Sequence, residues 1–143
     1  MKLRRSIAAA GAAVVLGGTG ALVLPAVASA HSATHTLKFT AVTKKSITFT
    51  KTTIGLQETD VNSTGKIIGF DDVYLTLTGP NSETANVALD TTGGFLYGAA
   101  TSTNGGKTFT GKVTGGTGAF KGATGTITVK TIGQKAAITI VYS

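Results

Sequence analysis

Acidic residues are few in this 143-residue chain, and two of them are adjacent, at Asp71 and Asp72. The segment that follows alternates apolar and polar residues, so strand periodicity places Asp71 on the same face as Val73 and Leu75. If that face is the interior, burial raises the pKa of the Asp71 carboxyl and suits it to act as a general acid or base. The alternative is that Gly69 marks a bulge and that Asp71 lies at a solvated rim.

Tyr97 and Tyr142 are further candidates for ligand binding. By strand parity, Tyr97 lies on the face of Phe95 and Tyr142 on the face of Ile140. In a hollow fold, their hydroxyls would orient a ligand. In a filled fold, they would be ordinary core tyrosines with satisfied hydroxyls. The sequence leaves both interpretations open.

Glu58 and Asp60 fall in a polar stretch that leads to Asn62. They belong either to the mouth of the fold or to a solvated loop. We expect the loop, because connecting segments are normally polar and exposed.

Composition excludes several kinds of active site. The chain has no cysteine and only two histidines, His31 and His35, so a Ser-His-Asp triad has no suitable histidine, and a copper site built on this pair would be poor. The glycine-rich segment 115–125 lacks the Gly-Lys-Ser/Thr ending of a phosphate-binding loop. Paired-carboxylate glycosidase chemistry is not excluded by counting, but no motif supports it. We expect no metal and no cofactor.

Residues 1–30 have the three-part pattern of a secretory signal peptide. Three basic residues precede an apolar run from Ile7 to Leu24, and Ala28-Ser29-Ala30 supplies small residues before the expected cleavage site. The alternative is an uncleaved membrane anchor, since the run approaches spanning length, but glycines interrupt it. The pattern predicts a secreted protein whose mature chain, residues 31–143, is not inserted in the membrane.

Removal of residues 1–30 weakens the case for a nucleic-acid partner. The remaining chain has ten lysines, six carboxylates and no arginine, which gives a formal charge of +4. Arginine is the preferred reader of phosphates and bases, and most of the lysines are scattered. We therefore expect no nucleic-acid binding.

Residues 31–143 are expected to form one all-β domain. They contain 26 threonines, which disfavour helix, and no window has helical spacing of large apolar residues. Turn signals rich in glycine and asparagine separate the strand-like segments. We predict a single antiparallel up-and-down β-barrel of about eight strands, because the connections are short and closure removes exposed edges. We expect threonine and lysine to face water, and the aliphatic residues and phenylalanines, Phe49 among them, to fill the interior. The clearest alternating segments are 36–41, 46–50, 73–78, 86–90, 108–113, 126–130 and 138–142.

The C-terminal half carries a family resemblance. The segment 115–125, GGTGAFKGATG, resembles the G-G-T-G-x-[FY]-x-x-A-x-G signature of the allene oxide cyclase and dirigent β-barrel superfamily. Upstream, 64–69 (TGKIIG) and Gly93-Gly94 are similar to two other glycine-containing segments of that family. The resemblance covers about residues 46–143, and it is greatest to the small exported bacterial members.

The resemblance implies an eight-stranded, calycin-like barrel with a cavity open at one end. Relatives bind hydrophobic or phenolic intermediates and steer a cyclisation or coupling without a cofactor, and several are trimers. Lys121 occupies a position where plant dirigent proteins carry arginine, which makes it a ligand-binding candidate, whereas Thr124 replaces a second arginine of that family.

These observations leave two functional classes open. In the first, the protein binds a small hydrophobic or phenolic molecule and possesses, if it is an enzyme, a cofactor-independent isomerase or cyclase activity. In the second, it is a non-catalytic extracellular structural or interaction protein with a filled barrel. A monomer or a homotrimer is expected, and a Thr/Lys-rich outer face argues against a large apolar interface.

Overall fold

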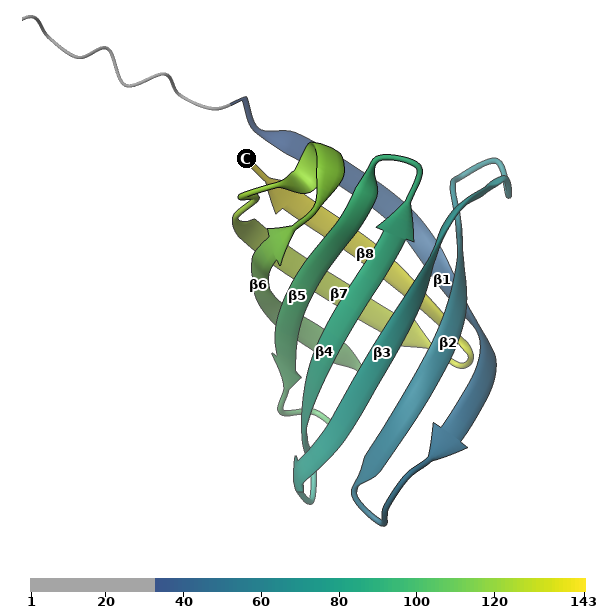
Figure 1. Cartoon of the computed structure of the whole chain (residues 1–143). Helices are drawn as coiled ribbons and strands as arrows, with labels where there is room; N and C mark the ends of the chain where they lie inside the picture. Colours follow the sequence, from purple (N-terminus) through teal and green to yellow (C-terminus); the bar gives the residue numbers. More distant parts are fainter. Residues whose placement is uncertain (1–32) are drawn as a thin grey trace, which may run out of the picture. The chain divides into compact units, whose positions relative to one another are not determined.

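Segments rich in β-branched residues form eight strands in the computed structural model, which describes residues 33–143 (Figure 1). Each strand pairs antiparallel with the next along the chain, and β8 pairs with β1, so the sheet closes into a barrel. The predicted all-β, eight-stranded up-and-down barrel is confirmed. The predicted leader, residues 1–30, lies outside the described residues. The strands are β1 (His35–Thr48), β2 (Thr53–Val61), β3 (Ile67–Gly79), β4 (Ser82–Thr91), β5 (Gly94–Ser102), β6 (Thr108–Gly116), β7 (Gly125–Ile132) and β8 (Lys135–Tyr142).

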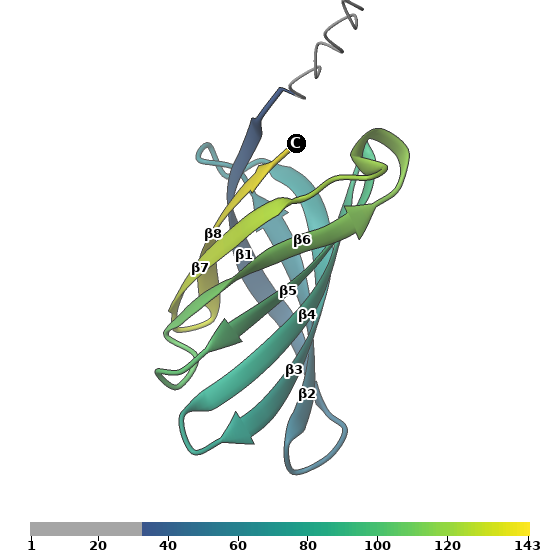
Figure 2. The same ribbon diagram turned by 90° about the vertical axis from the view of Figure 1, so that its left-hand side faces the viewer.

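The barrel has two different ends, and its strands cross obliquely between them (Figure 2). We call the end that carries the β2–β3, β4–β5 and β6–β7 connections the closed end. The other end, with the β1–β2, β3–β4, β5–β6 and β7–β8 connections, is the open end.

The β6–β7 connection covers the closed end with a short 3-10 turn, η1 (Gly118–Phe120). The Ala119 N–H donates a hydrogen bond to the Gly93 carbonyl oxygen at 2.8 Å, and the Phe95 N–H donates to Thr117 Oγ1 at 3.0 Å. Phe120 is buried in the core beneath this turn. The segment that carries the family resemblance therefore closes one end of the barrel.

Gly118 is required at this turn for two reasons. Its φ of 58° lies in the left-handed region. A side chain at this position would also collide with the carbonyl oxygen of Gly93. The tight packing of η1 on the β4–β5 turn thus depends on glycine.

Buried apolar residues fill the closed half of the barrel. The larger core cluster includes Phe39, Leu89, Leu96, Phe120 and Ile140. A smaller cluster of Ala85, Ala100 and Phe109 lies toward the open end. Small side chains in this second cluster leave the open half less completely filled.

A bulge in β1 changes which residues face the interior. The bulge lies between Thr43 and Lys45, and beyond it Ser46 faces the interior. Phe49 follows β1 and is 57% exposed; its ring lies beside Gly55. The expectation that Phe49 is an interior residue is therefore wrong. The segments 36–41 and 46–48 belong to one strand, not two.

No helix within residues 33–143 has the length and hydropathy needed to cross a bilayer.

Candidate functional site

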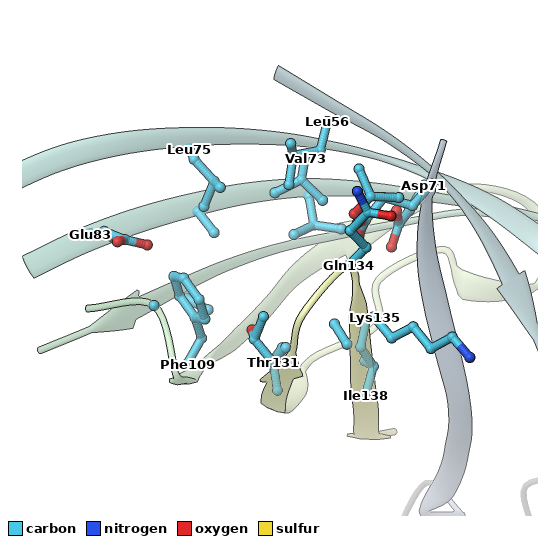
Figure 3. Close-up of a pocket in the computed structure, with 18 of the residues that line it drawn as sticks. Leu56, Asp71, Val73, Leu75, Glu83, Phe109, Thr131, Gln134, Lys135 and Ile138 are labelled. Atoms are coloured by element: carbon cyan, nitrogen blue, oxygen red, sulfur yellow. The ribbon is translucent and has the colours of Figure 1, made fainter. Parts of the chain in front are cut away.

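The open end of the barrel leads into a cavity of about 440 Å³ (Figure 3). Residues of the β5–β6 and β7–β8 turns form part of its rim. Pockets of this size hold small organic ligands. The barrel is therefore not completely filled. The main apolar lining residues are Leu56, Val73, Leu75, Val87, Phe109 and Ile138.

Asp71 lies in this cavity, on the inner face of β3. It is only 3% exposed, and neither of its carboxyl oxygens has a hydrogen-bond partner. Figure 3 shows Asp71 and Glu83 far apart in the view, with Val73 and Leu75 between them. Of the two interpretations that the sequence allowed for Asp71, the structure supports the interior orientation, and the solvated rim is wrong. Its role in ligand binding stays a prediction.

Glu58 is directly opposite Asp71 on the neighbouring strand β2. It is 8% exposed and also lines the cavity. The Thr43 hydroxyl of β1 donates a hydrogen bond to Glu58 Oε1 at 2.5 Å. Directly opposed residues on one face of a sheet have neighbouring side chains, so the two carboxyl groups form a pair in the cavity wall.

Asp60 is a third interior acid, two residues beyond Glu58 on the same face of β2. It is fully buried, does not line the cavity, and has no hydrogen-bond partner for either carboxyl oxygen. Gly69 lies beside it, and glycine is needed there because a Cβ atom would lie only 2.5 Å from the Asp90 carbonyl oxygen of β4. Three acids thus occupy adjacent interior positions on two strands.

The expectation that Glu58 and Asp60 lie in a solvated loop is wrong. Both belong to β2 and are buried. Residues 57–60 are all polar, so this part of the strand has no visible alternation of apolar and polar residues. In most strands, only the outer face is polar. The available signal was Leu56, which shares strand parity with Glu58 and Asp60 and indicates that all three face the interior.

No basic side chain among the described residues is buried with these acids. All ten lysines of residues 33–143 are exposed, and so is His35. Lys135 contributes to the cavity lining, but its amino group extends away from the other labelled side chains (Figure 3). The carboxyls are therefore buried without a cationic partner.

Burial raises the pKa of Asp71 to about 9, and the charges of Asp60 and Glu58 add to this effect. Burial likewise raises the pKa of Asp60 to about 7, with a further contribution from Glu58. At neutral pH, Asp71 is consequently a neutral carboxylic acid, able to donate a hydrogen bond into an apolar cavity.

The other predicted site residues do not line this cavity. Tyr97 is 39% exposed on the outer face of β5, where its ring stacks with Phe95 at 6.2 Å between centroids. Its predicted interior orientation is therefore wrong. The inner face of β5 belongs to the residues of opposite parity, including Leu96 and Ala100.

Tyr142 and Lys121 both lie near the closed end. Tyr142 is half-buried between His35 and Phe120, with ring centroids 5.3 Å and 5.5 Å away, and it packs against the core as its parity predicted. It borders only a shallow second pocket of about 150 Å³. Lys121 is exposed beside η1. The structure therefore brings Asp71 together with Glu58, and not with Tyr97, Tyr142 or Lys121.

The interior acids do not form a metal site. Within residues 33–143, no group of three or more His, Cys, Asp or Glu side chains is placed to hold a metal ion. What the arrangement offers is one hydrogen-bond donor, Asp71, next to one acceptor, Glu58, at the wall of an apolar cavity.

Comparisons with known proteins show a shared fold at low sequence identity. No family model and no curated protein matches the sequence. Among solved structures, a pyocyanin demethylase superposes with a TM-score of 0.61 at 17% identity, over 76% of this chain and 100% of that one. An exo-specific intermolecular Diels-Alderase superposes with a TM-score of 0.59 at 8% identity, over 78% of this chain and 98% of that one. Barrels of this fold thus include enzymes that act on small molecules.

Proposed function

We propose that this protein is a secreted barrel of the allene oxide cyclase and dirigent type that binds a small hydrophobic or phenolic molecule in its cavity. The observation that carries the proposal is the 440 Å³ cavity, mostly apolar, with the buried carboxyl of Asp71 in its wall. A structural protein with a filled barrel has no need of such a space.

Two independent lines support this proposal. The glycine-rich signature at 115–125 resembles that superfamily. The two solved structures named above share the fold and act as a demethylase and a Diels-Alderase.

The proposed role in chemistry is to hold a reactive molecule in one conformation for cyclisation or coupling. A cavity of fixed shape holds the reacting groups of the bound molecule close together in a productive orientation, which raises the rate of their reaction. Asp71 would donate a hydrogen bond to a ligand oxygen that becomes more negative during the reaction. A carboxylic acid kept neutral by burial is suited to that task.

The cavity proposal is tested by filling the cavity from one strand. Ala100 is buried and lines the cavity, whereas its neighbour Ala99 is exposed on the outer face of β5. We expect Ala100→Leu to weaken the binding of 2-naphthol, a small phenolic probe, at least about tenfold, because the added side chain occupies ligand space. The matched control Ala99→Leu should bind as the wild type does.

The chain has no tryptophan, so naphthalene fluorescence reports binding directly. Equal affinity of 2-naphthol for the Ala99→Leu and Ala100→Leu proteins, or no binding of 2-naphthol to the wild type, would contradict the proposed binding of phenolic molecules in the cavity. A melting curve for each variant shows whether it is folded.

A further inference from the structure

The interior of the barrel has an unusual charge balance. The described chain carries an excess of lysine, yet every lysine is exposed, and the buried ionisable groups Glu58, Asp60 and Asp71 are all acids. Buried acids are rare without a partner, and an unsatisfied buried polar group calls for an explanation. Glu58, the neighbour that faces Asp71, is itself an acid, and no basic side chain within residues 33–143 is buried with the pair.

The cavity wall beside Asp71 is where a partner can enter. Asp71 is 3% exposed, both of its oxygens lack a hydrogen bond, and it lines a cavity that continues to the open end. Glu58 lines the same cavity and has the Thr43 hydroxyl as its donor. A ligand that fills this space therefore meets two carboxyls with unused acceptor capacity.

We propose that the cavity selects an organic cation, a small apolar molecule carrying a protonated amine or a quaternary nitrogen whose charge lies against Glu58 and Asp71. The inference rests on the proposed small-molecule function and names the class of ligand. The cation provides the positive charge that no basic side chain of the described chain provides next to these buried acids.

An organic cation fits the remaining wall better than a metal ion. Most of the cavity lining is apolar, and no metal-ligand group of three or more side chains exists in the described chain. Phe109, which also lines the cavity, offers an apolar surface for the hydrocarbon part of such a ligand. Glu83, the third acid that lines the cavity, lies near the rim turn at Gly105 and Gly106, on the path by which a ligand enters.

A neutral ligand offsets the buried negative charge of the carboxyl pair less completely than a cation does. A carbonyl or hydroxyl oxygen can accept the Asp71 proton, but it leaves the charge of Glu58 buried with Thr43 as its only donor. A cation compensates Glu58 and also favours ionisation of Asp71, because an opposite charge nearby lowers the pKa of a carboxyl. Binding of the cation should therefore release protons.

The test uses two probes of nearly equal shape at pH 7, 2-naphthylmethylamine, which is protonated, and 2-naphthylmethanol, which is neutral. We expect the ammonium to bind wild-type protein at least about tenfold more tightly, the factor that corresponds to 1.4 kcal/mol. Calorimetry in two buffers of different ionisation enthalpy should show proton release for the ammonium and none for the alcohol.

Two variants assign the preference to the carboxyl pair. Glu58→Gln and Asp71→Asn should each reduce the ammonium preference to about threefold or less. Glu58→Gln removes a carboxylate from the wall, and Asp71→Asn removes the carboxyl that ionises when the cation binds. Asp72→Asn is the matched control, because Asp72 is exposed on the opposite face of β3 and lies outside the cavity. It should retain the full preference.

The outcomes separate this inference from the proposed function. Equal or tighter binding of the alcohol to wild-type protein overturns the cation inference and leaves a neutral-ligand cavity. Failure of both probes to bind, together with failure of 2-naphthol, overturns the cavity function itself. The comparison of the two probes on wild-type protein decides the inference even where a variant does not fold.

Discussion

The raised pKa of Asp71 makes the stability of the ligand-free barrel depend on pH, and Asp71→Asn should remove much of that dependence. In the unfolded chain an aspartate titrates near 3.8, whereas in the barrel Asp71 titrates at about 9. As the pH rises from about 4, the unfolded state loses this proton and the folded state keeps it. The stability is therefore greatest below the unfolded pKa and is lost progressively as the pH rises toward the folded pKa.

The size of the effect follows from linkage. One proton of difference between the two states changes the free energy of unfolding by about 1.4 kcal/mol per pH unit. Between pH 5 and pH 7, Asp71 alone should thus lower the stability by about 3 kcal/mol. Asp60 adds a similar slope that ends near its own pKa of about 7. Asparagine does not titrate, so Asp71→Asn should remove one of these two slopes.

The charged residues that face Asp71 determine whether its pKa shift keeps the direction set by burial. From β2, Glu58 and Asp60 approach Asp71, whereas from β4 the residue opposite it is Leu89. Glu83 and Lys135 are the other charged residues that line the cavity. Apart from exposed Lys135, all the charges that face Asp71 are negative, so they reinforce burial and do not reverse the sign.

Urea unfolding followed by circular dichroism, at pH 5, 6, 7 and 8, measures the slope. A buried asparagine amide without a partner destabilises the barrel equally at each pH, so the slope reports ionisation and not packing. Asp72→Asn, on the exposed face of the same strand, should keep the wild-type slope. If Asp71→Asn and wild type show parallel pH profiles, the argument that Asp71 is buried as a neutral acid is refuted.

Two further predictions concern the closed end and export. Phe120→Ala should destabilise the barrel by about 3–5 kcal/mol in urea unfolding, because it empties a core position beneath η1. Phe95→Ala, a ring 41% exposed on the outer face, should cost much less, and equal losses would contradict the closed-end role of Phe120. Native mass spectrometry of protein from culture supernatant should show a chain that begins at His31, as a monomer or a homotrimer, while an uncleaved chain in the membrane fraction would contradict the leader prediction.

The sequence was sufficient to predict the barrel because the alternating segments fall on six of the eight strands, all except β2 and β5, and the turns between strands carry glycine or asparagine. It was insufficient where a local irregularity changes parity. The bulge between Thr43 and Lys45 cannot be read from the residue types, so Phe49 was assigned to the interior, although it is exposed. A strand-parity argument holds only up to the first bulge.

The candidate site was half-predictable for a related reason. The aliphatic residues that follow Asp71 at the same parity indicate that its side chain can face the interior. Glu58 and Asp60 have no such signal directly after them, and a segment with several acids has the polarity expected of a solvated loop. Tyr97 shows the converse error. Phe95 and Tyr97 alternate as interior residues do, but they stack on each other outside the barrel, and the inner positions of β5 are held by Leu96 and smaller residues. The polarity of the residues along a strand thus does not identify its inner face when acids are buried inside the barrel or aromatic rings lie outside it.

The segment 115–125, which resembles a family signature, and the candidate chemistry lie in different parts of this barrel. The 115–125 segment folds over the closed end and packs on the β4–β5 turn, so its glycines and Phe120 are explained by closure of the barrel. The interior acids come from β2 and β3, and the hydroxyl that contacts Glu58 comes from β1. Resemblance in the signature therefore constrains the fold and leaves the cavity wall free to vary. The ligand of this protein has to be inferred from Glu58 and Asp71, because two acids buried in the cavity wall without a basic partner among residues 33–143 are the strongest chemical constraint inside the barrel.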